Sequence, residues 1–255
     1  MSKNLAVEAR KLTKNYHAIQ AIADATFNIG HAEIVGFAGD NGAGKSTLMK
    51  MVAGSVQAST GQLFIDGVER KVWSPAAVRD EGVEMVYQDL ALCDNLNVYE
   101  NIFLGREPKL RKGGMLVLDH ATMRKRAHEL LDRLQVHLKS LVDPVSCLSG
   151  GERQMVAICR ATAFSPKLII MDEPTAALSV SAGRPLMDLM RRLPSESTAV
   201  MIVSHRLSDL IETSNRIYVV GRGAMVNELK TSETTEHALL RAMAGLDEPV
   251  TGELV

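Results

Sequence analysis

A glycine-rich run has residue types and spacing that could hold phosphate. It reads Gly39-Asp40-Asn41-Gly42-Ala43-Gly44-Lys45-Ser46-Thr47. Its glycines let successive backbone N–H groups turn toward one anion, because no Cβ blocks the approach. A helix beginning near Lys45 would add the positive end of its dipole. The lysine of this pattern reaches the β- and γ-phosphates, and the Ser46 hydroxyl can hold Mg²⁺. The run predicts a nucleoside triphosphate site.

Two carboxylates follow another apolar run, Leu168-Ile169-Ile170-Met171-Asp172-Glu173. In an open α/β sheet, ligands lie at the carboxyl ends of the strands. Asp172 is suited to hold Mg²⁺ directly or through water. Glu173 would then orient and polarise an attacking water. The alternative is a surface acidic pair that merely closes a strand, but the phosphate-binding pattern favours the chemical interpretation.

Two further polar residues, Gln88 and His205, each end an apolar run. The neutral amide of Gln88 can contact Mg²⁺ or the attacking water without adding charge, at a position where a lobe could hinge. The His205 imidazole could contact the γ-phosphate and couple its loss to motion. Taken alone, either residue could be incidental. A functional interpretation of either residue depends on the presence of the glycine-rich run and the paired carboxylates in the same chain.

A second candidate anion site lies in Leu148-Ser149-Gly150-Gly151-Glu152-Arg153-Gln154. Ser149 and Glu152 have the spacing of a capping box, which satisfies free N–H groups at the start of a helix. A glycine-flanked helix N-terminus also binds anions by the same physics, and Ser149 and Gly151 would then contact a phosphate. The residues alone do not choose between these two interpretations.

The surrounding sequence predicts an α/β fold. Apolar runs on both faces, as in residues 168–171 and 199–203, suit central strands of a parallel sheet. Residues 89–164 have mostly helical spacing, which predicts a helical lobe inserted into the core. We therefore expect one domain over residues 1–255, with its core at about 1–88 and 165–228 and a polar tail from about 229. A weak helix is predicted near residues 236–243.

Composition excludes several classes of protein. The chain has 255 residues, with 29 Lys and Arg against 30 Asp and Glu, so charge gives no argument for binding nucleic acid. No apolar run approaches the ~20 residues that span a bilayer, and residues 1–4 lead into no secretory segment. The three cysteines have no metal or redox spacing, which indicates reduced thiols.

The order of these motifs resembles that of the nucleotide-binding subunits of ABC transporters. Residues 39–47, Gln88, 148–154, 168–173 and His205 are similar to the Walker A, Q-loop, signature, Walker B and switch-histidine motifs. The resemblance implies a P-loop NTPase (RecA-like) core with a mostly parallel sheet, an antiparallel β subdomain and an inserted helical subdomain. It also implies that Tyr16 stacks on adenine, although an edge-strand tyrosine is the alternative.

A narrower resemblance implies a function. Residues 86–92 and 101–107 are similar to ATPases of bacterial monosaccharide importers of the ribose, xylose and fructose type. The family hydrolyses ATP with Mg²⁺ at the cytoplasmic face of the cell membrane. Its partners are transmembrane permease subunits, a second ATPase subunit (expected as a homodimer, with a sibling chain as the alternative) and, indirectly, an extracytoplasmic sugar-binding protein. Nucleic acid is not an expected partner.

In that family each ATP lies between two subunits. The resemblance implies that residues 39–47 of one subunit and Ser149 and Gly151 of the other hold one ATP, with Glu173 as base. Two departures stand out: Glu152 where Gln is frequent, and Ser179 where the D-loop usually ends in Asp. The alternatives are an ATP-binding module with little hydrolysis and a soluble ABC ATPase.

Overall fold

The computed structural model describes residues 5–112, 114–194 and 197–246. Its largest sheet has the strand order β12-β11-β3-β10-β9-β6, and β12 is its antiparallel member. The bounds of its strands are β3 Ile34–Ala38, β6 Val83–Val86, β9 Leu168–Asp172, β10 Ala199–Val203, β11 Arg216–Gly221 and β12 Ala224–Lys230. The predicted mostly parallel core sheet is therefore confirmed.

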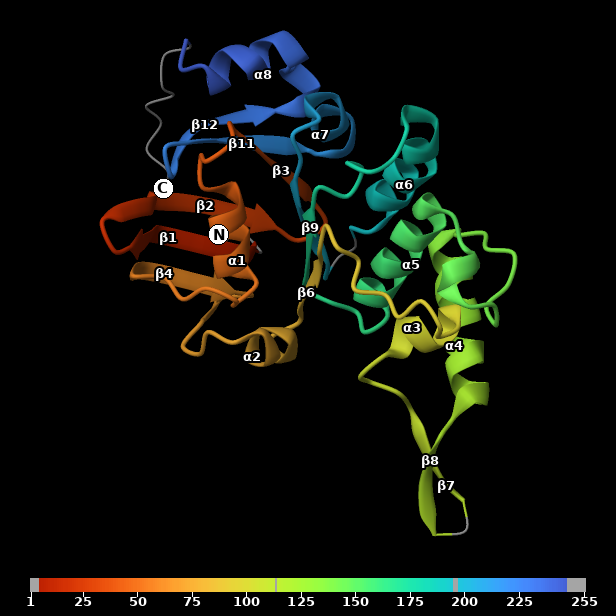
Figure 1. Cartoon of the computed structure of the whole chain (residues 1–255). Coiled ribbons are helices and arrows are strands. Elements are labelled where there is room, and N and C mark those ends of the chain that lie inside the picture. The colour runs from red at the N-terminus through yellow and green to blue at the C-terminus, as the bar shows by residue number, and fades with distance from the viewer. Residues whose placement is uncertain (1–4, 113, 195–196, 247–255) are drawn as a thin grey trace.

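A smaller antiparallel sheet lies beside the core, with the order β2-β1-β4-β5. Its strands are β1 Leu5–Tyr16, β2 Ile19–Gly30, β4 Thr60–Ile65 and β5 Val68–Glu69. Figure 1 shows this sheet and the helices α3 to α5 on opposite sides of the core strands. The antiparallel β part and the helical part of the expected fold are both present.

Eight α-helices complete the described part of the chain. They are α1 Lys45–Val52, α2 Pro75–Asp80, α3 Val98–Phe103, α4 His120–Leu134, α5 Gly150–Thr162, α6 Val180–Arg192, α7 Leu207–Thr213 and α8 Glu236–Met243. Two short 3₁₀ turns span Val145–Cys147 and Thr231–Glu233. The weak helix predicted near residues 236–243 is thus α8, while the end of the predicted tail, residues 247–255, lies outside the described residues.

Side chains of the core strands alternate between two hydrophobic clusters, because successive residues of a strand point to opposite faces. In β9, Ile169 and Met171 pack with the helices, whereas Leu168 and Ile170 pack toward α1 and the antiparallel sheet. All four are fully buried. Burial on both faces explains why the strand reads as a continuous apolar run.

One element of the lobe departs from the mostly helical expectation. A β-hairpin formed by β7 Lys109–Lys112 and β8 Met115–Leu118 separates α3 from α4. Its strands are only four residues each, too short for strand periodicity to stand out against the helical spacing that follows. The two consecutive glycines of the sequence interrupt helical spacing, and Gly114 has φ 85°, a region that favours glycine.

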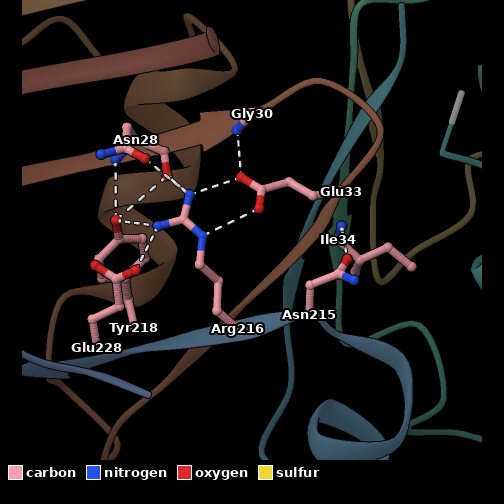
Figure 2. Close-up of polar contacts among 8 residues, drawn as sticks. All are labelled: Asn28, Gly30, Glu33, Ile34, Asn215, Arg216, Tyr218 and Glu228. Atoms are coloured by element: carbon pink, nitrogen blue, oxygen red, sulfur yellow. Dashed lines mark hydrogen bonds and ion pairs between the residues drawn. The ribbon is translucent and has the colours of Figure 1, made fainter. Parts of the chain in front are cut away.

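Arg216 of β11 joins the two sheets at their boundary (Figure 2). Its guanidinium donates to the Asn28 carbonyl oxygen of β2 at 2.7 Å and pairs with Glu33 at 2.7 Å and Glu228 at 2.8 Å. The Tyr218 hydroxyl lies 2.7 Å away. These contacts fix the antiparallel sheet relative to the strands that carry the candidate site.

Candidate nucleotide site

Four of the predicted motifs meet at one edge of the core sheet. β3, β10, β9 and β6 are neighbouring parallel strands, and Val203 pairs with both Phe37 and Asp172 in register. Met171 pairs with Val86. The segments that follow these strand ends, including Gln88, Glu173 and His205, therefore leave the sheet side by side.

Two glycines of the loop between β3 and α1 are packed too closely for a side chain. A Cβ on Gly44, at φ 105°, would lie 2.7 Å from the Ala21 carbonyl oxygen. A Cβ on Gly39 would lie 2.3 Å from the Val220 carbonyl oxygen. Both distances are shorter than any ordinary contact, so glycine is required at each position to seat the loop between its neighbours.

Lys45 begins α1 and lies across the loop. Its Nζ donates to the carbonyl oxygen of Gly39 at 2.6 Å and to that of Asp40 at 3.0 Å. Burial lowers the Lys45 pKa, and the carboxylates of Glu173, Asp40 and Asp172 oppose that shift. A partly desolvated ammonium at a helix N-terminus is a favourable arrangement for phosphate.

A cleft of about 480 Å³ opens over this loop. Most of the residues predicted for chemistry line it together, namely Asn41, Gly42, Gly44, Lys45, Ser46, Thr47, Gln88, Asp172, Glu173 and His205. The volume is within the usual range for small-molecule sites. Ile19, Gln20, Ala21, Ala176 and Val203 also line it, so β2 supplies part of the wall.

Asp172 and Glu173 place two neighbouring carboxyl groups on the lining of the cleft. The Asp172 pKa is raised, first by burial and then by the neighbouring Glu173 carboxylate, while Lys50 and Lys45 oppose the shift. A raised pKa shows that the surroundings do not fully compensate the carboxylate. A divalent cation supplied with a ligand would provide the missing positive charge.

Glu173 is held in an unusual conformation. Its φ of 51° lies in the left-handed region, where a residue other than glycine is strained. Its N–H donates to the Val203 carbonyl oxygen at 2.8 Å, and its carboxylate accepts from the His205 backbone N–H at 3.2 Å. The His205 Nδ1 lies 2.7 Å from the same carboxylate. The imidazole predicted for the γ-phosphate thus contacts the predicted base.

The signature segment forms the N-terminus of α5. Ser149 is the N-cap and shares a capping box with Glu152, whose carboxylate accepts from the Ser149 N–H at 2.8 Å and from its hydroxyl at 2.7 Å. Ser149 and Gly151 are not among the residues that line the cleft of Lys45. Within one chain the two candidate anion sites are therefore separate.

The remaining predicted residues lie outside the cleft lining, which omits Tyr16, Gly39, Asp40 and Ala43. Tyr16 pairs with Ile19 across β1 and β2, and its exposed ring lies 5.1 Å from the Lys14 Nζ. Ile19 does line the cleft, so Tyr16 lies directly opposite a residue of the cleft wall. Its role with adenine stays a prediction.

Arg206 is a residue that sequence reasoning missed. Its guanidinium donates to the carbonyl oxygens of Thr175 at 3.2 Å and Leu178 at 3.3 Å, in the loop after Glu173. The Thr175 hydroxyl in turn donates to Asp209 at 2.6 Å. This loop is thereby tied to the segment that carries His205. Arg206 also pairs with Asp209 at 3.3 Å, but its partners in this loop are backbone carbonyls, so no residue pattern could reveal the contact with the loop.

Ser179 ends this loop as the N-cap of α6, accepting from the Ala182 N–H at 3.3 Å. Its hydroxyl therefore has a local structural role at the position where the family usually places Asp. Among the described residues, no group of three or more His, Cys, Asp or Glu is arranged to hold a metal by itself. The helices of those residues also include none with the length and apolar character to cross a bilayer.

Comparison with known proteins agrees with this geometry. The family model described as ABC transporter matches residues 22–176. The xylose/arabinose import ATP-binding protein of Sulfolobus acidocaldarius is 39% identical over 237 residues, which cover 93% of each chain. The fructose import ATP-binding protein of Rhizobium meliloti is 35% identical, covering 98% of this chain and 97% of its own.

A solved structure agrees as well. A dimeric ATP-binding cassette in a post-hydrolysis state, bound to ADP and phosphate, has 27% sequence identity and a TM-score of 0.73. The match covers 88% of this chain and 98% of that one. From the family match and the extent of identity to import ATP-binding proteins, the chain belongs to the ABC transporter family as an ATPase domain.

Proposed function

We propose that this chain is the ATP-hydrolysing subunit of an ABC importer for a monosaccharide. The observation that carries the proposal is the convergence of Lys45, Ser46, Asp172 and Glu173 on one cleft. Two relatives are named as import ATP-binding proteins for xylose/arabinose and for fructose, and these names support a sugar as the cargo. The work would be done at the cytoplasmic face of the membrane, on permease subunits.

Mg²⁺ fits the donor set of the cleft. Ser46 offers a hydroxyl, Gln88 an amide oxygen and Asp172 an undercompensated carboxylate, all hard oxygen ligands on one lining. Because the described residues contain no group of His, Cys, Asp and Glu that holds a metal by itself, phosphate oxygens and water would complete the coordination. The cation would neutralise charge that develops on the transferred phosphoryl group.

The residues of the chain have distinct roles in this proposal. Gly39 to Thr47 and α1 bind the phosphates, with Lys45 turning from the loop carbonyls to the β- and γ-phosphates. Glu173 accepts a proton from the attacking water at its carboxylate. His205 holds that carboxylate through Nδ1, and its own exposed imidazole stays within reach of the γ-phosphate. The left-handed backbone at Glu173 fixes the direction of the base.

A second copy or a sibling chain would complete the site. Ser149 and Gly151 lie away from the cleft of their own chain, and the helix end they form is suited to an anion. A head-to-tail pair of subunits would bring this end to the ATP of the partner. The dimeric relative with ADP and phosphate supports such a pairing. Permease subunits would contact the loop after Gln88 and the helical lobe, with a sugar-binding protein acting through them.

The test is ATP turnover by Glu173→Gln beside Lys45→Ala. Removing a general base lowers turnover by roughly 10²- to 10⁴-fold, so Glu173→Gln should bind ATP, persist as a dimer and release almost no phosphate. Lys45→Ala should lose tight ATP binding instead. Phosphate release and binding of a fluorescent ATP analogue separate the two defects. Normal hydrolysis by Glu173→Gln would refute its role as base, and slow hydrolysis by the unmodified chain with its permease would favour the module with little hydrolysis.

A further inference from the structure

The hairpin of β7 and β8, here called the basic hairpin (residues 109–112 and 114–118), projects from the helical lobe away from the rest of the chain (Figure 1). All eight residues of its two strands are exposed. Five of them are large and apolar, and the exposed fraction reaches 69% for Met115 and 67% for Leu116. A strand pair whose apolar side chains are all exposed indicates a surface that something else covers.

Both faces of the basic hairpin combine cations with aliphatic side chains. Lys109 pairs with Leu118 and Arg111 with Leu116, so these four share one face. The other face has the pairs Leu110–Val117 and Lys112–Met115. None of the ion pairs among the described residues includes Lys109, Arg111 or Lys112. Three cations without an ion pair therefore stand among exposed apolar side chains, and of their charges that of Lys109 also helps to lower the pKa of Glu107.

The base of the basic hairpin is firmly attached. The Asp119 N–H donates to the Pro108 carbonyl oxygen at 2.9 Å, and the Asp119 carboxylate caps α4 through the Thr122 N–H at 3.0 Å. On the other side, Arg106 pairs with Glu84 of β6 and lies 4.5 Å over the Phe164 ring. β6 leads directly to Gln88, which lines the nucleotide cleft. A displacement of the basic hairpin would therefore also move the edge of this cleft.

We propose that the basic hairpin binds the anionic lipid surface of the membrane that holds the permease. Cations interspersed with aliphatic chains match the headgroup region of a bilayer, where phosphates and acyl chains meet. Residues 109–112 and 114–118 contain no acid, amide or hydroxyl, so the basic hairpin presents only positive charge and apolar side chains. An anionic lipid surface complements both.

The location of the basic hairpin is consistent with that partner and rests on the proposed function. A cleft of about 240 Å³ lined by Tyr87, Leu104 and Arg106 lies between the core and the lobe, where the permease is proposed to dock. The basic hairpin begins three residues after Arg106. It would therefore reach the bilayer beside the docked permease and anchor the lobe there.

The experiment measures vesicle binding of the full chain by co-sedimentation. Vesicles of phosphatidylcholine with about 30% phosphatidylglycerol are compared with vesicles of phosphatidylcholine alone. Each cation near an anionic surface contributes several-fold, so the combined Lys109→Gln, Arg111→Gln and Lys112→Gln variant should bind about 100-fold more weakly. Replacing Leu116 and Leu118 with Ser should also weaken binding, and high salt should weaken binding of the unmodified chain.

The matched control removes the same charge elsewhere. Lys11, Lys71 and Lys230 are exposed and belong to the sheets and their connections, and their joint change to Gln should alter vesicle binding less than threefold. Equal loss in both triple variants, equal binding to neutral vesicles or no vesicle binding at all would overturn the proposal. The last result would leave an acidic permease loop as the occupant.

The readout separates this proposal from the proposed function. Every hairpin position is exposed, so the substituted chains should fold and bind a fluorescent ATP analogue as the unmodified chain does. If Lys45→Ala and Glu173→Gln hydrolyse ATP normally while anionic vesicle binding still depends on residues 109–112, the ATPase assignment fails and the lipid assignment stands.

Discussion

The Arg216 cluster and the nucleotide cleft both contain partly buried charges, but only the Arg216 cluster surrounds its charge with compensating partners. At the sheet boundary, Arg216 is paired with Glu33 and Glu228 and donates to Asn28 (Figure 2). Its pKa is raised by these partners in spite of burial. In the cleft, the Asp172 pKa is raised because burial and another carboxylate oppose its ionisation. The first charge is satisfied by the fold, and the second is not.

The difference separates a structural charge from a functional one. A buried ion that meets all its partners within the chain stabilises one arrangement and has nothing to offer a ligand. A carboxylate left short of positive charge favours a cation brought from outside, at a cost to the free chain. A perturbed pKa alone does not mark a site, since pKa values are shifted in both regions. At Asp172 the shift disfavours the charged form, and this carboxylate also lines a cleft together with Lys45 and Glu173.

The largest expected effect is on the satisfied region. Arg216→Met leaves the partly buried Glu33 carboxylate without its cation, with the Gly30 N–H still donating to it, and removes the tie to Asn28. Removing one partner of a buried ion pair typically costs about 3 kcal/mol. The free energy of unfolding in urea should therefore fall by about that amount.

Arg184→Met is the matched control for that substitution. Its side chain is 65% exposed, and its partner Glu212 also pairs with Arg191. An exposed pair of this kind contributes about 0–1 kcal/mol. If the two variants unfold at the same urea concentration, the Arg216 cluster is not the tie between the sheets that its contacts indicate.

The cleft could be predicted from the sequence, whereas the Arg216 cluster could not. Glycine spacing, apolar runs and acids at strand ends are local patterns, so the cleft residues from Lys45 to Glu173 could be named from the sequence, along with the fold class. Contacts of distant residues with backbone atoms leave no such pattern. Arg216 to the Asn28 carbonyl and Arg206 to the Leu178 carbonyl could therefore not be predicted.

In the cleft, removing a charged side chain should raise the free energy of unfolding instead of lowering it. Because the Asp172 pKa is raised above its ordinary 3.8, the folded chain binds more protons than the unfolded chain just above that value. Stability is therefore lost as pH rises through this window, and the loss persists at neutral pH. Asp172→Asn removes the charge and should stabilise the nucleotide-free chain at pH 7 by up to about 1 kcal/mol, discounted for partial exposure, while ATP turnover is lost.

Urea unfolding at pH 7 and near pH 3, with a chelator present, checks the sign. In acid Asp172 is protonated in both states, so the advantage of Asp172→Asn should vanish. Asp188→Asn is the control, because the Asp188 side chain is 47% exposed and already paired with Arg191 at 2.8 Å. A gain that is the same at both pH values would mean that packing, not charge, explains the change.

The smallest effect is expected at Glu152, which belongs to both kinds of region at once. Within the chain it is satisfied, because hydrogen bonds from the Ser149 hydroxyl and N–H lower its pKa. That lowered pKa contributes stability above the ordinary value of 4.5, and the contribution is lost as pH falls through the folded pKa. In the proposed dimer the same carboxylate faces the triphosphate of the partner and repels it.

Glu152→Gln should therefore move stability and assembly in opposite directions. The amide oxygen can still accept from Ser149 but without charge, so unfolding at pH 7 should become easier by no more than about 0.5 kcal/mol. Removing the negative charge should lower the ATP concentration for dimer formation severalfold, measured by light scattering in a Glu173→Gln background. If dimer formation instead weakens together with stability, Glu152 acts only by shaping the helix end, and the signature segment does not meet a phosphate across the interface.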